Sequence, residues 1–532
     1  MRLLDVPGRS TVHAPVGMAA TSQPLSTMAA IQILQAGGNA MDAAIAAVAV
    51  QCVVEPQPTG SGGYCFSLYP PMGVGAIPFT GAGRARAGAT ADWYAEHGIG
   101  ELPRQSPHSV TVPGAVDAWA QLSADHGAMP LGDVLEPAIR YARDGFAVNH
   151  RVSFDWARNE EILANDPASA EHYLKDGKAY GLGDRVRLPL LAGTLEEIAA
   201  KGRAGFYEGW VADDMVGFLS SLGGHHTRAD FDAAVGEYVE PIKTAYKGHE
   251  VWECPPNGQG IVALEMLNIL GGMELGKLDP LSAERLHIEI EAARLAYCDR
   301  EAVLADPAQA DVPVGTWLSP EYADRQRALI DRTRRMPALP PSPLAAHQDT
   351  VYLCVVDKDR NAVSFINSLF MSFGSALTAP KSGVLLHNRG QGFVLDPGHP
   401  NCIAPGKRPL HTIIPGMVTR DGRTVMPFGV MGGHYQACGH AHFLTNLFEW
   451  GMDLQEAIDF TRVFPDVADP DGRVQVESGL PDGVRRRLED MGHETYLAPS
   501  PIGGAQAIWI DWERGILKGA SEPRKDGLAI GY

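Results

Sequence analysis

Long stretches of the chain show the apolar spacing of helices. Apolar residues recur every three or four positions, which predicts helices over Ser26–Ala36, Ala40–Val54, Leu131–Phe146, Ala283–Val303 and Ala437–Trp450. Ser26 is placed to cap the first of these helices. The second is apolar all round except for Asp42, so we expect it to be buried.

Short apolar runs between turn residues predict strands. Val351–Val356 and Ala362–Ile366 flank the polar turn Asp357–Asn361, a pattern that indicates a β-hairpin. Further strands are predicted at Cys65–Tyr69, Glu250–Cys254, Gly383–Asn388, Leu410–Val418, Thr424–Gly429, Ala505–Asp511 and Leu517–Ala520. Strand pairs among long helical stretches favour a layered α/β or α+β protein.

A change of composition precedes the hairpin. Arg325–Gln348 begins charged and becomes proline-rich, which is typical of an exposed linker. It leads directly to Asp349-Thr350, one residue before the first strand. Thr350 can be an ordinary strand-start residue. It can also be a nucleophile freed by cleavage of the Asp349–Thr350 bond, with its own new α-amine as general base.

Composition limits the partners of the protein. The 532 residues are 45% apolar and 20% charged, a globular mixture long enough for about three ordinary domains. A net charge of −19 argues against nucleic-acid or anionic-membrane partners. Seven scattered cysteines fit a reducing compartment. The N-terminus lacks a signal-peptide core and Ala43–Val54 is shorter than the ~20 residues of a membrane span, so we expect a soluble, cytoplasmic protein.

A cluster of metal-ligand residue types lies near the C-terminal end of the chain. His434, Cys438, His440 and His442 are spaced so that some of them share a helix face. Zinc sites usually show tighter motifs with a carboxylate or further cysteine ligand. We therefore expect histidines that are buried or line a pocket, and neither a metal nor a cofactor.

Several segments, in order and spacing, resemble the γ-glutamyltransferase (glutathione hydrolase) family of N-terminal-nucleophile hydrolases. They include GMAATSQPLSTMAAIQILQAGGNAMDAA, HIEIEAARLAYCDREAVLADP, DTVYLCVVDKDRNAVS, GKRPLHTIIP, FGVMGG and ASEPRKDG. The resemblance implies an α+β protein with a four-layer αββα sandwich. It also implies self-cleavage into a large subunit, 1–349, and a small subunit, 350–532, which remain associated.

The resemblance assigns the reaction to four residues. Thr350 matches the nucleophile, and Ser368 matches the position whose hydroxyl supports it. Gly432-Gly433 stands where the family has an oxyanion hole, in which backbone N–H groups stabilise the tetrahedral intermediate. Ser368 can equally be a polar strand residue.

The positions that recognise the glutamyl group differ from the family pattern. Thr80 stands where the true transpeptidases have an arginine for the α-carboxylate. Phe370 and Gly392 replace the asparagine and the acidic residue that hold the α-amino group, and His411-Thr412 replaces a Ser-Ser pair. Loss of these partners removes charge-assisted recognition of an amino acid.

Arginines offer another kind of recognition. Arg389 lies in the segment Asn388–Gly392, at a position that contacts the glutamyl group in the family. Together with Arg84 it could bind a substrate carboxylate, as in oxamate amidohydrolase and similar amidases with Asn-Arg-Gly segments.

Three functions follow from the sequence. The first is hydrolysis or transfer of γ-glutamyl groups, including those of glutathione. The second is hydrolysis of a different small acidic amide, oxamate-like or like a β-lactam side chain. The third is a non-catalytic protein of the same fold. The first two functions imply a small-molecule substrate as the binding partner. The sequence does not decide whether the protein forms a homo-oligomer.

Overall fold

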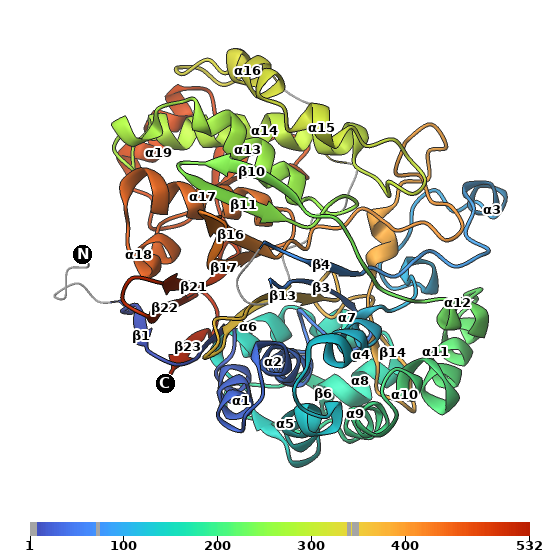
Figure 1. Ribbon diagram of the computed structural model, residues 1–532. Helices are drawn as coiled ribbons and strands as arrows, with labels where there is room; N and C mark the ends of the chain where they lie inside the picture. Colours follow the sequence, from blue (N-terminus) through green and yellow to red (C-terminus); the bar gives the residue numbers. More distant parts are fainter. Residues whose placement is uncertain (1–7, 71–74, 338–341, 343–349) are drawn as a thin grey trace.

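A computed structural model describes residues 8–70, 75–337, 342 and 350–532. Two seven-stranded sheets lie face to face, and helices cover the outer face of each sheet (Figure 1). The layers are therefore helix, sheet, sheet and helix. This confirms the α+β class and the αββα sandwich that the resemblance implies.

The first sheet is antiparallel throughout. Its strands lie in the order β1 (Val12–Ala14), β22 (Ile516–Ser521), β21 (Gly504–Asp511), β17 (Arg423–Met431), β16 (Gly416–Arg420), β11 (His249–Glu253) and β10 (Ile242–Tyr246). The helices α13 (Gly260–Gly271) and α17 (Tyr435–Trp450) pack on its outer face, and α14 (Ala283–Val303) packs on α13.

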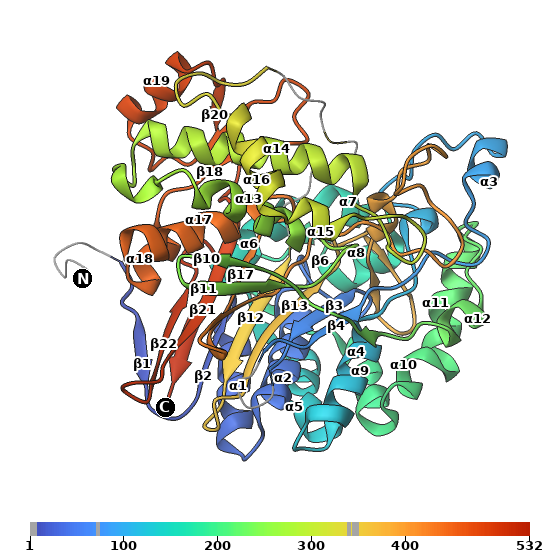
Figure 2. The same ribbon diagram turned by 45° about the horizontal axis from the view of Figure 1, so that its top comes forward.

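The second sheet is also antiparallel. Its order is β23 (Leu528–Gly531), β2 (Met18–Thr21), β12 (Val351–Val356), β13 (Ala362–Ser368), β3 (Tyr64–Leu68), β4 (Pro78–Gly81) and β9 (Glu237–Tyr238). Figure 2 shows β12 and β13, the predicted hairpin, in the middle of this sheet. The outer face carries α1 (Pro24–Gln35), α2 (Ala40–Val54) and α4 (Ala115–His126), and α5 (Leu131–Asp144) packs on α2.

Three apolar clusters fill the spaces between the layers. Alternation along β12 shows how one strand serves two of them, since Leu353 and Val355 pack toward the helices while Tyr352 and Cys354 pack toward the other sheet. A Cβ on Gly429 of β17 would lie 2.5 Å from the Tyr352 ring, so the sheets approach closely there. By the same alternation, Thr350 faces the space between the sheets.

Helix ends follow from local capping. The buried helix α2 spans the predicted residues, and Asn39 and Asp42 form a capping box at its start. The prediction that Ser26 caps the first helix is wrong. Gln23 accepts the N–H of Leu25 at 2.6 Å, because a proline at the first helical position lets the helix begin earlier.

Two predicted strands are shorter than expected. Of Leu410–Val418, only the part from Gly416 onward is strand, and the preceding residues form a loop in which His411 bridges to Gly258. Of Gly383–Asn388, only Leu385–Leu386 pairs as β15, before a 3₁₀ turn over Arg389–Gly392. In both places apolar side chains are buried by a loop rather than by strand pairing.

The predicted linker and cleavage point are only partly visible. The first residues of Arg325–Gln348 belong to helix α16 (Pro320–Leu329). Asp349 lies outside the described residues, and Thr350 directly precedes the central strand β12. The second sheet thus combines strands from both sides of this bond. In the described part of the chain, helices that are apolar over the length needed to cross a bilayer are absent.

Candidate active site

Thr350 and Ser368 lie at the same end of the inter-sheet space. Val351 pairs with Asn367, so continuing the register by one residue places Thr350 opposite Ser368. Ser368 in turn pairs with Tyr64 of β3. Residues opposite each other in antiparallel strands share a face, so Thr350, Ser368 and Tyr64 form a row across three strands. The Thr350 side chain is 1% exposed, and its Oγ1 has no hydrogen-bond partner among the described residues.

The residues after β13 turn sharply. The Ser368 hydroxyl accepts a hydrogen bond from the Phe370 N–H at 3.0 Å. Phe370 has a φ of 85°, which a bulky residue rarely adopts. The turn places its buried ring against the Arg389 guanidinium, 5.4 Å from the ring centre.

Gly432 and Gly433 form the turn between β17 and α17. Their φ values of 127° and 59° fall where glycine is favoured. Tyr435 and Gln436 donate backbone hydrogen bonds to the Gly432 and Gly433 carbonyls, at 3.0 and 3.2 Å, and so begin the helix. Gln259 donates its side-chain N–H to the Gly433 carbonyl at 3.0 Å. The positive end of the α17 dipole therefore lies at this turn.

Arg389 is a buried cation with no carboxylate partner in the part of the chain that the structure describes. Its exposed fraction is 1%, and none of its three guanidinium nitrogens has a hydrogen-bond partner among the described residues. The rings of Tyr64 and Phe370 lie 5.1 and 5.4 Å from the guanidinium. Burial lowers the pKa of Arg389 to about 9, which still leaves it charged at neutral pH. An isolated buried charge is costly, so a ligand anion would stabilise this site.

Other buried arginines of this protein show what a structural arginine looks like. Arg285 donates to Glu289 at 2.7 Å, and Arg462 donates to Glu522 at 2.6 Å. Arg300, which is also fully buried, is paired with Glu301. Arg389 differs from all three because no described carboxylate pairs with it.

Two histidines beside Arg389 are neutral. Burial, and then the charge of Arg389, lower the pKa of His387 and of His411 well below their ordinary values. His387 accepts the Arg389 backbone N–H at its Nδ1, at 3.0 Å. The His411 ring lies 4.2 Å from the Phe66 ring, and its Nδ1 has no partner within the described ranges. The neighbouring Thr412 carbonyl accepts a hydrogen bond from Gln259 at 2.9 Å.

The other predicted substrate contacts have structural roles in this conformation. The half-exposed Arg84 donates to Glu237 at 3.3 Å and to the Gly406 carbonyl at 3.2 Å. Thr80 is buried on β4, and its hydroxyl accepts the Ala82 N–H at 3.3 Å. A Cβ on Gly392 would lie 2.3 Å from the Leu410 carbonyl oxygen, so the backbones touch there.

Sequence reasoning missed Tyr64. Its hydroxyl donates to the Gly83 carbonyl at 2.7 Å and contacts the Thr111 hydroxyl, which fixes the ring face toward Arg389. In the sequence, Tyr64 is a single aromatic residue between a glycine-rich loop and a predicted strand. That position gives no indication of an arginine more than 300 residues away in sequence.

The residues of the predicted histidine cluster point to different protein groups. His434 Nδ1 lies 3.0 Å from Arg300, His440 Nδ1 lies 2.6 Å from Glu253, and His442 Nδ1 lies 2.9 Å from Glu289. Cys438 contacts the Tyr297 hydroxyl at 3.7 Å. The four side chains are therefore held apart rather than gathered around one point.

Another group, His287, Glu291 and His493, has ligand atoms close enough for a metal ion. However, His287 Nδ1 already lies 2.7 Å from His493 Nε2. Glu291 accepts from Arg294 and from the Met336 N–H, both at 2.7 Å. These bonds, and the charge of Arg294, make the group a structural cluster.

The stacked antiparallel sheets between helix layers define the N-terminal-nucleophile hydrolase class. The chain belongs to the γ-glutamyltranspeptidase family, whose model matches residues 26–532, and it is a hydrolase or acyltransferase of that class. It is 38% identical over 517 residues to the glutathione hydrolase-like YwrD proenzyme of Bacillus subtilis, covering 95% of this chain and 97% of the relative.

Two further relatives are similar over nearly the whole chain. The oxamate amidohydrolase proenzyme of Klebsiella pneumoniae is 33% identical over 530 residues, covering 97% of this chain and 98% of the relative. The crystal structure of cephalosporin acylase from Bacillus halodurans matches with a TM-score of 0.93 and 38% identity, covering 100% of this chain and 98% of that chain. The names of these relatives refer to three different substrates, glutathione, oxamate and a cephalosporin.

Proposed function

We propose that the chain is cut before Thr350 and hydrolyses a small anionic amide through an acyl-enzyme on that residue. The position of Thr350 before a central strand and the word proenzyme in the names of its relatives support the cleavage. Segments 1–349 and 350–532 both supply strands to the second sheet, so they would remain together as two subunits.

The chemistry uses groups already described. The freed α-amine of Thr350, with an ordinary pKa near 8, takes the hydroxyl proton as Oγ1 attacks the amide carbonyl. Ser368 lies opposite Thr350 and supports the hydroxyl. The Gly432-Gly433 turn stabilises the oxyanion with backbone N–H groups at the positive end of α17. The α-amine passes this proton to the leaving nitrogen as the C–N bond breaks, so that the amine or ammonia departs and the acyl ester remains on Thr350. Water then hydrolyses the ester, which releases the acid and restores the Thr350 hydroxyl.

The observation that carries the substrate assignment is that the buried Arg389 has no hydrogen-bond partner for its guanidinium among the residues described. A substrate carboxylate would supply the anion that its guanidinium lacks. A substrate with an α-ammonium group beside its carboxylate would need a protein anion close to Arg389. No described carboxylate pairs with the Arg389 guanidinium. We therefore favour an amide whose acyl part carries a carboxylate and no free α-amino group, as in oxamate.

Hydrolysis or transfer of γ-glutamyl groups is the second candidate. The glutathione hydrolase-like name of one relative favours it. The two candidates differ in one measurement, the release of ammonia from oxamate against the release of an anilide from a γ-glutamyl substrate.

Replacement of the nucleophile tests the cleavage. Purified protein is expected to give two bands on a denaturing gel, at roughly 37 and 20 kDa by dividing the chain in proportion to length. Thr350→Ala is expected to give one full-length band and no activity. A full-length band for the unaltered protein, or two bands for Thr350→Ala, would contradict the proposal.

Replacement of Arg389 tests the substrate class. Arg389→Met removes the charge and keeps much of the volume, so KM for oxamate should rise roughly 10- to 100-fold, as for the loss of ~1.5–3 kcal/mol of charge-assisted hydrogen bonding. Arg84→Gln is the control, because that side chain already has protein acceptors. Equal changes of KM in the two variants would show that Arg389 does not bind the substrate.

A further inference from the structure

The stretch Ile502–Ala505 packs directly behind the Gly432-Gly433 turn. A Cβ on Gly432 would lie 2.8 Å from the Gly503 Cα. A Cβ on Gly503 would lie 2.7 Å from the Met431 carbonyl oxygen and 2.6 Å from the Tyr435 ring. Gly503 therefore contacts the last residue before the two glycines and a residue that begins α17 just after them.

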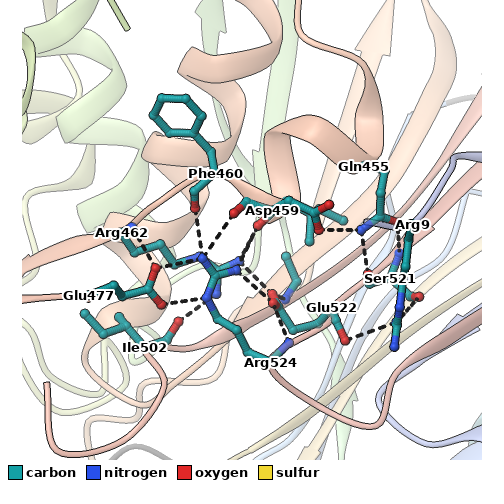
Figure 3. A network of polar contacts seen from close by, with 12 residues as sticks. Arg9, Gln455, Asp459, Phe460, Arg462, Glu477, Ile502, Ser521, Glu522 and Arg524 are labelled. Carbon is teal, nitrogen blue, oxygen red and sulfur yellow. Dashed lines mark hydrogen bonds and ion pairs between the residues drawn. The ribbon is translucent and has the colours of Figure 1, made fainter. Parts of the chain in front are cut away.

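A buried ion pair holds both ends of this stretch (Figure 3). Arg462 donates to the Ile502 carbonyl at 2.6 Å and to the Glu522 carboxylate at 2.6 Å. The same Glu522 oxygen accepts the Ala505 backbone N–H at 2.8 Å. Arg462 and Glu522 are 3% and 0% exposed, so water does not weaken these bonds.

A second arginine completes the network. Arg524 donates to the other Glu522 oxygen at 2.9 Å and to Glu477 at 2.6 Å. It also donates to the Phe460 carbonyl at 3.0 Å (Figure 3). In contrast to Arg389, these charges are paired with each other, so the network needs no ligand. Its geometry serves to fix the backbone.

We propose that Glu522 and Arg462 are positioning residues for catalysis. They hold Gly503 against Gly432, and this contact fixes the direction of the Gly432-Gly433 N–H groups. The inference rests on the proposed role of those groups as oxyanion donors. Such donors act only when aimed at the charge that develops in the transition state, so their misalignment lowers kcat more than it raises KM.

A matched pair of glycine variants tests this inference. Gly503 and Gly515 have nearly the same φ, 65° and 67°, so alanine strains both backbones alike. A Cβ at Gly515 meets nothing within 4 Å, whereas one at Gly503 crowds Met431 and Tyr435. We expect Gly503→Ala to lower kcat at least tenfold with KM changed by less than about threefold. Gly515→Ala should keep kcat, and its loss of thermal midpoint should be the smaller of the two, because it comes from the backbone strain alone.

If Gly503→Ala fails to fold, Glu522→Gln is a second variant with the same predicted signature, and it adds no heavy atoms. Circular dichroism and the two-band pattern confirm folding and cleavage in each variant. An unchanged kcat in Glu522→Gln, an equal loss of kcat in Gly515→Ala, or a change mainly in KM would overturn the positioning role. Activity of the Thr350→Ala variant would instead contradict the proposed function on which this inference rests.

Discussion

At the residue scale, the site is defined by groups whose hydrogen-bonding capacity is unused. Thr350 Oγ1, the three nitrogens of Arg389 and His411 Nδ1 are buried, and they lack partners in the described part of the chain. Buried polar groups are normally paired, so these exceptions support the substrate site proposed above. Aromatic faces beside Arg389 stabilise the cation without occupying its hydrogen-bond donors.

Phe370 provides a test at this scale. Phe370→Asn suits the positive φ but removes a ring from the Arg389 face, so KM for an anionic amide should rise roughly 2- to 30-fold, as for ~0.5–2 kcal/mol of cation–π interaction. Phe370→Tyr keeps the ring and should keep KM. Steady-state kinetics on both variants measure the difference, and equal KM values would exclude a role for the ring.

At the element scale, three elements carry the residues of the proposed site. The hairpin β12–β13 carries Thr350 and Ser368, the 3₁₀ turn after β15 carries Arg389, and the β17–α17 junction carries the two glycines. The ion network of Glu522 joins the end of β22 to the start of β21, to helix α18 (Leu454–Asp459) and to the segment after that helix. It thereby links the stretch behind the Gly432-Gly433 turn to β22, the strand next to the edge strand β1.

Acid stability reports on this network. Burial alone would raise the pKa of Glu522, but Arg462 and Arg524 outweigh it and lower the pKa to about 2. Because the pKa of Glu522 is lower in the folded protein, its ionisation stabilises the fold at pH values above its ordinary pKa of 4.5. This stabilisation is lost as the pH falls from 4.5 toward 2. This contribution is about 3 kcal/mol at neutral pH.

Glu522→Gln removes that pH dependence. The difference in thermal midpoint between the unaltered protein and Glu522→Gln should be constant above about pH 5 and should shrink between pH 4.5 and pH 2. Differential scanning calorimetry across this range measures it. A difference that stays the same down to pH 2.5 would show that Glu522 does not titrate in this way.

At the scale of the whole molecule, the two predicted subunits are interleaved. In the second sheet, β12 and β13 lie between β2 and β3, so strands from after Thr350 pair with strands from before it on both sides. Separation would expose both the sheet edges and the apolar layers on either face. Cleavage would therefore free an α-amine without dividing the core.

The net charge of −19 gives a prediction at this scale. It repels an approaching anion at long range, whereas the attraction of the buried Arg389 acts at contact. Salt screens the exposed charges more than the buried one. For an anionic amide, kcat/KM should therefore rise between 10 and 200 mM salt, while for a neutral amide it should not. A fall of kcat/KM for the anionic amide over this range would indicate that positively charged groups line the approach to the site.

Much of the fold could be predicted from local pattern. Helices such as α2 and α14 and the hairpin have periodicities that appear within a few residues, and the structure confirms them. The loop around His411 and the short β15 could not be predicted, because their apolar residues are buried by distant segments rather than by a regular element.

The sequence by itself determined the class of chemistry. The order of motifs indicated the family, and the hairpin with its preceding threonine indicated where a nucleophile would lie. Only the tertiary structure decided the surroundings of Arg389, because pairing, burial and ring contacts depend on residues far apart in the chain. It placed Arg389 between Tyr64 and Phe370 with no carboxylate from the described ranges, and left Arg84 bound to Glu237 at the surface.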